Sequence, residues 1–206
     1  MPARARGTFM VILLLLGLLA LPCAAMAIPA PGQDFPDMLL PAPALAEDAA
    51  SLGIAPGRPF RLSDVKADFL LLEAMSAMCP YCQADAPHIN EVHAAIQKQG
   101  FGDRLKVLGV GVNNTEFEME LFRAKYGMLF PHVVDTDMTM VDKAGVTGTP
   151  TYFLLDLRGQ GLKVLHVVEG RMDGPDAFLR DILAKTGLRG QAAGTQAKPA
   201  AQEDKK

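Results

Sequence analysis

The sequence contains no tryptophan and only three tyrosines among its 206 residues. It therefore lacks the aromatic platform on which nucleic-acid bases usually stack. Its formal net charge is −3, which argues against a surface that neutralises many phosphates. Three cysteines are also too few for a scaffold held together by many disulfides. These shortages argue against nucleic acid as a partner and against the small disulfide-rich class of secreted proteins.

What the chain does have is a composition suited to a packed core, with 50% hydrophobic and 21% charged residues. We expect one α/β domain over residues 60–187. Residues 28–59, rich in proline, alanine and glycine, are expected to form an irregular arm, in which 44–53 is a candidate for a short helical turn. Residues 188–206 show no hydrophobic periodicity and are expected to be a disordered tail.

The N-terminus has the pattern of a secretory signal peptide. Arg4 and Arg6 precede an apolar run at 10–21, and Ala25-Met26-Ala27 offers a site for cleavage. The apolar run is short for a membrane span, which needs about 20 residues. We expect residues 1–27 to be removed after Ala27 and the mature protein to be periplasmic or otherwise exported. The alternative is an uncleaved N-terminal anchor; otherwise, membrane contact is expected only through a redox partner.

Hydrophobic patterning predicts an alternation of strands and helices. Strands are expected at 68–75, 104–113, 131–135, 151–156 and 162–169, and helices at 83–99, 115–126, 138–144 and 173–186. The alternation of strands and helices over 68–144 implies parallel strands. The two consecutive strands at 151–156 and 162–169 imply an antiparallel edge of the sheet. The expected architecture is a central mixed sheet flanked by helices.

The main chemical motif is Cys79-Pro80-Tyr81-Cys82, between a buried strand and a helix. The free N–H groups and the dipole of a helix start favour a thiolate. We expect Cys79 to be the exposed nucleophile and Cys82 the buried resolving thiol, the two forming a redox disulfide. Pro80 has no N–H, so donors to the Cys79 sulfur would come from Tyr81 and Cys82. Pro80 and Tyr81 are also assigned to substrate contact.

The cysteine pair could instead bind zinc or form a purely structural disulfide. A zinc site completed by His88 and His93 conflicts with helix geometry. His93 would lie about 16 Å along the axis from Cys82, whereas zinc ligands lie about 2.0–2.3 Å from one metal. A purely structural disulfide would close only a tiny loop and stabilise little. We therefore predict no metal and no other cofactor.

Further motifs give the chain a family resemblance. Gly148-Thr149-Pro150-Thr151 precedes an expected edge strand, Pro87 follows the cysteine pair within its helix, and Gly170 follows the last hairpin. With these motifs, residues 60–187 resemble the thioredoxin superfamily. The long spacing between Cys82 and Pro150 is similar to the exported TlpA/ResA-like branch. The resemblance implies a thioredoxin-like fold with a strand–helix insertion between the CxxC helix and the cis-proline strand.

The resemblance also implies roles for individual residues. A cis Thr149–Pro150 bond would present the Thr149 backbone to a substrate strand. Glu73 stands where thioredoxins carry a buried acid, and burial would raise its pKa so that it could exchange a proton with Cys82. Asp85 matches an acid of the TlpA/ResA-like branch and is a candidate modulator. The alternatives are a Glu73 that reaches solvent and an Asp85 that is an ordinary helix-face carboxylate.

We expect an exported thiol–disulfide oxidoreductase that exchanges disulfides with protein substrates. By resemblance it would act as a reductant, use a membrane thiol electron donor and serve cytochrome c maturation. One alternative is a peroxiredoxin-like thiol peroxidase, since Ser76 lies three residues before Cys79. Another is a non-catalytic thioredoxin-like module that senses redox state or binds metal.

Overall fold

The computed structural model describes residues 27–189. The expected signal peptide, apart from Ala27, and the expected tail, apart from residues 188 and 189, lie outside the described residues. No helix within 27–189 is long and apolar enough to cross a membrane.

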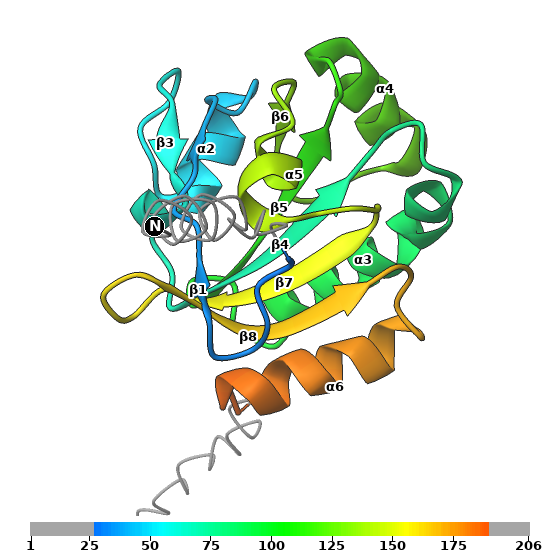
Figure 1. Cartoon of the computed structure of the whole chain (residues 1–206). Coiled ribbons are helices and arrows are strands. Elements are labelled where there is room, and N and C mark those ends of the chain that lie inside the picture. The colour runs from blue at the N-terminus through cyan, green and yellow to red at the C-terminus, as the bar shows by residue number, and fades with distance from the viewer. Residues whose placement is uncertain (1–26, 190–206) are drawn as a thin grey trace, which may run out of the picture.

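A six-stranded mixed sheet with the order β1-β8-β7-β4-β5-β6 forms the centre of the molecule (Figure 1). Three strands run parallel: β4 (Phe69–Met75), β5 (Leu105–Val112) and β6 (His132–Asp135). Antiparallel pairing then adds β7 (Thr151–Asp156), β8 (Leu162–Glu169) and the short β1 (Asp34–Phe35). The expected parallel front and antiparallel edge are confirmed.

Helices cover both faces of this sheet (Figure 1). One face carries α3 (Pro80–Lys98), α4 (Glu116–Tyr126) and α6 (Pro175–Thr186). The other carries α5 (Thr139–Ala144) and the N-terminal segment with α2 (Ala46–Leu52). The central strand β4 is buried along its whole length. Its odd-numbered side chains pack toward α3 and its even-numbered ones toward α5 and the N-terminal segment.

Local sequence signals explain where the two helices nearest the cysteine pair begin. α3 begins three residues earlier than expected, because Pro80 occupies the first helical position and Cys79 is the N-cap. α4 begins with a capping box, in which Thr115 and Glu118 satisfy each other's backbone N–H groups. Gly127 ends α4 in the left-handed conformation at φ 61°.

The segment 28–59 is irregular only in part: the helical turn expected at 44–53 is present as α2, whereas short strands replace much of the expected irregular arm. β1 joins the edge of the main sheet by pairing with β8. A second ribbon pairs β2 (Leu39–Leu40) with β3 (Phe60–Arg61), followed by a 3₁₀ turn at Leu62–Asp64. Phe35, Met38 and Leu40 are buried in the core. The arm folds because these widely spaced apolar side chains cover one face of the sheet, although its prolines and glycines hide any periodicity.

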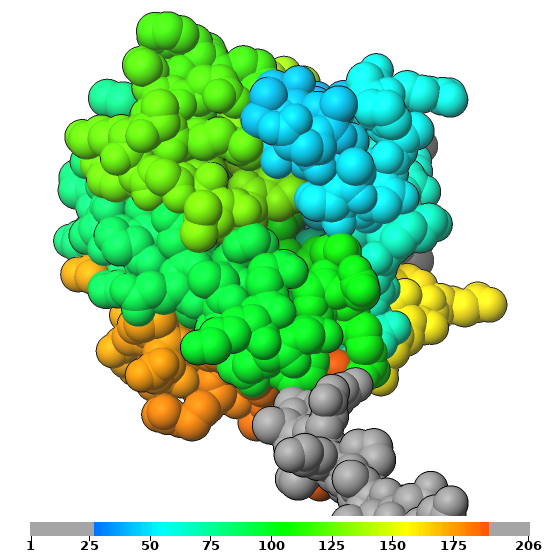
Figure 2. Space-filling model, turned by 180° about the vertical axis from the view of Figure 1, so that it is seen from behind, coloured from blue at the N-terminus to red at the C-terminus, as the bar shows by residue number. Residues whose placement is uncertain are grey.

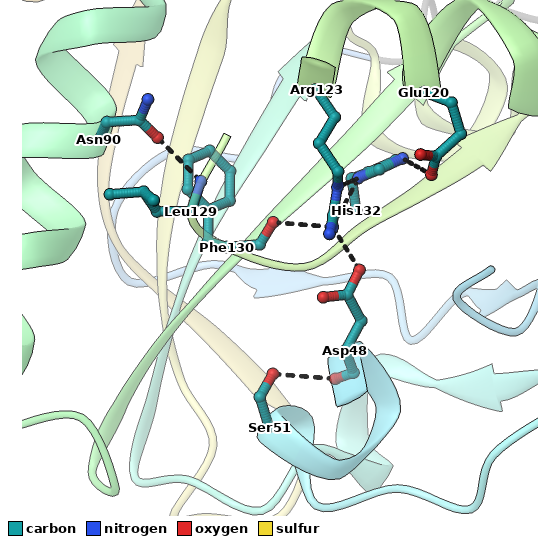
Figure 3. A network of polar contacts seen from close by, with 8 residues as sticks. All are labelled: Asp48, Ser51, Asn90, Glu120, Arg123, Leu129, Phe130 and His132. Atoms are coloured by element: carbon teal, nitrogen blue, oxygen red, sulfur yellow. Dashed lines mark hydrogen bonds and ion pairs between the residues drawn. The ribbon is translucent and has the colours of Figure 1, made fainter. Parts of the chain in front are cut away.

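A polar network joins the N-terminal segment to the helix that follows β5 (Figure 3). Arg123 of α4 pairs with Asp48 of α2 and donates its Nε–H to His132 Nδ1 at 3.2 Å. His132 Nε2 lies 3.5 Å from Glu120 Oε1. Seen from behind, α2 (blue) lies against the segment around Arg123 and His132 (light green), although the two are far apart in sequence (Figure 2).

Candidate active site

The two cysteines occupy unequal environments at the start of α3. Cys79 is the N-cap residue and is partly exposed, whereas Cys82 lies in the first turn and is fully buried. Both thiols are free in this structure. An external disulfide can therefore reach Cys79 and cannot reach Cys82.

The surroundings of Cys79 favour its thiolate. Partial burial on its own would raise the pKa of the Cys79 thiol. Hydrogen bonds from the Thr149 side chain, from the backbone and thiol of Cys82 and from the Tyr81 backbone outweigh burial and lower the pKa below its ordinary value. Tyr81 and Cys82 are the two backbone donors expected from the position of Pro80.

The surroundings of Cys82 favour its protonated form. Burial raises the pKa of the Cys82 thiol far above its ordinary value, and the nearby Glu73 carboxyl adds to the shift. The Ser76 N–H, 3.5 Å from the Cys82 sulfur, offsets only part of this effect. A buried thiol of this kind needs a base to remove its proton before it can attack a disulfide.

The Thr149–Pro150 turn lies directly beside Cys79. The bond between Thr149 and Pro150 is cis, as the resemblance implies. The Cys79 thiol donates to the Thr149 carbonyl oxygen at 3.1 Å. The Thr151 hydroxyl donates to the Gly148 carbonyl at 2.8 Å and braces the turn. The backbone of Thr149 is thus held against the nucleophilic sulfur.

Glu73 lies beneath the cysteine pair on β4. It is only 2% exposed, so the alternative in which it reaches solvent is wrong. Burial raises the pKa of Glu73 to about 8, although a hydrogen bond with Tyr152 on the neighbouring strand opposes the shift. Its Oε2 atom has no hydrogen-bond partner. Glu73 therefore carries its proton at neutral pH and sits close enough to Cys82 to influence that thiol.

Asp85, one turn beyond Cys82, is fully buried. It accepts hydrogen bonds from Arg171 Nε at 2.8 Å, from the Met172 N–H at 2.9 Å and from the Tyr152 hydroxyl at 3.3 Å. The alternative of an ordinary helix-face carboxylate is wrong. Asp85 is instead the point at which α3, β7 and the loop after β8 meet.

The residues that hold the loop before Cys79 were not predicted from the sequence. Asn114 accepts the Ala77 N–H at 3.0 Å, and Gln83 donates to the Ala77 carbonyl at 2.9 Å. Asn114 could have been suspected, because a polar pair directly follows the buried strand β5. Tyr152 was also missed, since a tyrosine in an apolar strand looks like an ordinary core residue.

The surface around Cys79 is apolar. Met78 is 72% exposed and Tyr81 64% exposed, and Met78 and Leu121 line a small hollow of about 140 Å³. Met75, by contrast, is buried in the core. Pro80 and Tyr81 therefore border an open surface, as their assignment to substrate contact requires.

The two histidines considered as zinc ligands lie apart from the cysteine pair. His88 Nδ1 is 3.4 Å from Asp85 Oδ1, and His93 borders a separate cavity next to α2. Among residues 27–189 there is no cluster of three or more histidine, cysteine, aspartate or glutamate side chains able to hold a metal.

Comparisons with known proteins agree with this geometry. The chain is 32% identical over 120 residues to the thiol-disulfide oxidoreductase ResA of Geobacillus thermodenitrificans, covering 58% of this chain and 65% of the relative. It is 30% identical over 116 residues to ResA of Bacillus subtilis, covering 56% and 61%. The matched segments thus span less than two thirds of these relatives.

The fold comparison covers more of the chain. A putative thiol:disulfide interchange protein DsbE from Chlorobium tepidum superposes with a TM-score of 0.60 at 24% identity, covering 77% of this chain and 99% of that one. The expected thioredoxin-like fold is confirmed. The AhpC/TSA family model matches residues 31–161, which include the N-terminal segment, the cysteine pair and the cis-proline turn. The chain therefore belongs to the AhpC/TSA family.

Proposed function

We propose that the protein is an exported thiol–disulfide oxidoreductase that reduces disulfides in protein substrates. The observation that carries this proposal is the asymmetry of the pair, in which an accessible Cys79 with a lowered pKa lies above a buried Cys82 with a raised pKa. The similarity to proteins named thiol-disulfide oxidoreductase supports the same chemistry.

Reduction of a substrate would take two steps. The Cys79 thiolate attacks one sulfur of the substrate disulfide, so that a mixed disulfide forms and the other substrate sulfur leaves as a thiolate. Glu73, which carries its proton at neutral pH, first loses that proton. Cys82 then gives its own proton to the Glu73 carboxylate and attacks Cys79. The products are a reduced substrate and a Cys79–Cys82 disulfide, and two electrons have passed to the substrate. Reversal of the same steps would oxidise a dithiol.

The site suggests how a substrate strand would be held. It would lie across Pro80 and Tyr81 and against the Thr149–Pro150 turn. Thr149 offers a backbone carbonyl at 3.1 Å from the Cys79 sulfur. In this arrangement Asp85 modulates the buried side of the pair through its contact with Tyr152.

The proposed setting follows from the N-terminal pattern. A signal peptide at 1–27, cleaved after Ala27, would deliver the domain at 28–187 with its tail to the periplasm or another exported compartment. Such compartments are oxidising, so a reductant there needs an electron supply. We propose a membrane thiol donor and a role in cytochrome c maturation.

The test is the equilibrium reduction potential of the Cys79–Cys82 pair, measured by thiol alkylation in defined redox buffers. A value near −270 mV, about that of thioredoxin, supports a reductant. A value between about −120 and −180 mV would instead indicate an oxidant or an isomerase. In a companion experiment, Cys82→Ser should trap mixed disulfides with substrates, and Cys79→Ser should not. A pair that exchanges with no thiol would overturn the proposal.

A further inference from the structure

A line of buried polar side chains leads from the resolving cysteine toward the surface. Cys82, Glu73, Tyr152 and Asp85 are each at most 2% exposed. Glu73 and Tyr152 face each other across β4 and β7, and the Tyr152 hydroxyl donates to Asp85 Oδ2 at 3.3 Å. Beyond Asp85 lies His88, whose Nδ1 is 3.4 Å from Asp85 Oδ1 and whose side chain is 33% exposed.

The two ends of this line are polar atoms without partners. Glu73 Oε2 and His88 Nδ1 are both buried atoms that make no hydrogen bond. An unpartnered buried polar atom costs about 1–3 kcal/mol, so two of them on one line call for an explanation. Carboxyl, phenol and imidazole groups can each take up and give up a proton. The four side chains are therefore chemically able to pass a proton along the line.

We propose that Tyr152, Asp85 and His88 carry the proton of Glu73 to solvent, which gives the protein a fast route to the Glu73 carboxylate that takes the proton of Cys82. This inference rests on the proposed function and explains how its base is reset. Because Glu73 rests protonated at neutral pH, its proton must leave the buried site in every cycle before Glu73 can act as a base.

The transfer balances in protons and in charge. Glu73 gives its proton to the Tyr152 oxygen while the Tyr152 hydroxyl proton passes to Asp85. Asp85 gives this proton to the neutral His88 ring at Nδ1. The imidazolium then turns its partly exposed ring and loses the same Nδ1 proton to water, which restores the Nε2–H tautomer. Tyr152, Asp85 and His88 return to their starting forms. One proton reaches solvent and no electron moves.

The groups around the line restrict where the proton can leave. Tyr152 is faced by Glu73, Asp85 and Cys82, and the Phe178 ring of α6 packs against its ring with the two centroids 5.1 Å apart. At Asp85 the other partners are the Arg171 guanidinium and the Met172 N–H. Both of these groups only donate, so neither can accept a proton from Asp85. Among the described contacts of Asp85, His88 is the acceptor that leads to the surface.

The relay can be tested in a single turnover of the whole protein. Cys79 is first converted to a mixed disulfide with thionitrobenzoate, and the attack of Cys82 then releases the coloured thiol, which is followed by stopped flow. Below about pH 8 Glu73 starts protonated, so release requires the relay. Tyr152→Phe removes the hydroxyl and keeps the ring that packs on Phe178. We expect it to slow release about tenfold or more below pH 8, with a smaller effect at higher pH.

A second variant examines the surface end of the relay. His88→Ala should also slow release, and added imidazole should restore the rate because it can occupy the half-exposed position. His93→Ala, a histidine variant on the same helix, is the matched control and should show neither effect. A merely structural role for His88 would not produce rescue by imidazole.

The possible outcomes separate the relay from the reaction itself. Rates of Tyr152→Phe and His88→Ala within about twofold of the unmodified protein at every pH would overturn the relay. Slowing in Tyr152→Phe alone would overturn His88 as the exit. Failure of the unmodified protein to release thionitrobenzoate at any pH would overturn the proposed function, whatever the variants do.

Discussion

Arg171 donates its Nε–H to Asp85 Oδ1 at 2.8 Å, although the two residues are 86 positions apart in the chain. The next residue, Met172, donates its backbone N–H to the other carboxylate oxygen at 2.9 Å. The loop after β8 is thereby fastened to the helix that begins with the cysteine pair. The two residues of the ion pair differ in exposure, since the Asp85 side chain is fully buried and the Arg171 side chain is 44% exposed.

This asymmetry predicts the effect of removing the carboxylate. In Asp85→Ala, Arg171 can turn to water, but the Met172 N–H stays buried without a partner. We expect a loss of about 1–3 kcal/mol in the free energy of unfolding. Urea denaturation measures it, with Asp103→Ala as control because the Asp103 side chain is fully exposed. Equal stability of the two variants would contradict the bracing role of Asp85.

Glu73 predicts that the free energy of unfolding decreases as the pH rises. Burial raises its pKa to about 8 in the folded protein, so between pH 4.5 and 8 the folded state binds more protons than the unfolded state. The contribution of Glu73 to the free energy of unfolding is complete below about pH 4.5 and is lost as the pH rises through 8. The full effect is at most about 5 kcal/mol.

Glu73→Gln removes this titration and keeps the shape of the side chain. We expect the variant to lose less stability than the unmodified protein between about pH 6 and pH 9, as measured by urea denaturation. It should also resolve mixed disulfides more slowly, because an amide cannot accept the proton of Cys82. Identical pH dependence in the two proteins would show that Glu73 does not titrate in the fold.

The sequence predicted the central elements and the cysteine pair because these depend on local patterns. β7 and β8 match their expected bounds, and α3 begins three residues early at the proline and ends one residue early at Lys98. The N-terminal segment was misjudged because Phe35, Met38 and Leu40 acquire their role only against a distant sheet face. The role of Tyr152 could not be predicted for the same reason, because its hydroxyl acts as a polar link only when Asp85 lies beside it. Long-range contacts of this kind produce no hydrophobic periodicity in the sequence.

Asn114 allows a test of how the nucleophile is positioned. Its side chain accepts the Ala77 N–H, and it is 2% exposed. In Asn114→Ala that N–H loses its partner, so we expect a loss of about 1–3 kcal/mol. The loop before Cys79 should also loosen. Alkylation kinetics across pH would then show a higher pKa for Cys79, because the donors at its sulfur are less well placed.

Asn114→Asp supplies a matched comparison. The carboxylate can still accept from Ala77, so the loop should keep its position better than in the alanine variant. If both variants alkylate like the unmodified protein, the contact stabilises the fold without positioning the cysteine.

His132 predicts weaker stability in acid. Burial, followed by the charge of Arg123, lowers its pKa to about 4. The unfolded state therefore binds more protons between about pH 6.5 and pH 4, and stability falls as the pH drops through that window. The full effect is at most about 3 kcal/mol. A proton on His132 Nδ1 would also confront the Arg123 N–H that now donates to it, which would weaken the contact between α4 and β6 (Figure 3).

His132→Asn should flatten this acid dependence, because the amide oxygen can accept from Arg123 and cannot become charged. Denaturation midpoints at several pH values between about 4 and 7 measure the change. Part of the slope should remain, since burial also lowers the pKa values of His93 and His166. A variant with the full slope of the unmodified protein would mean that His132 is not the group whose protonation weakens the fold.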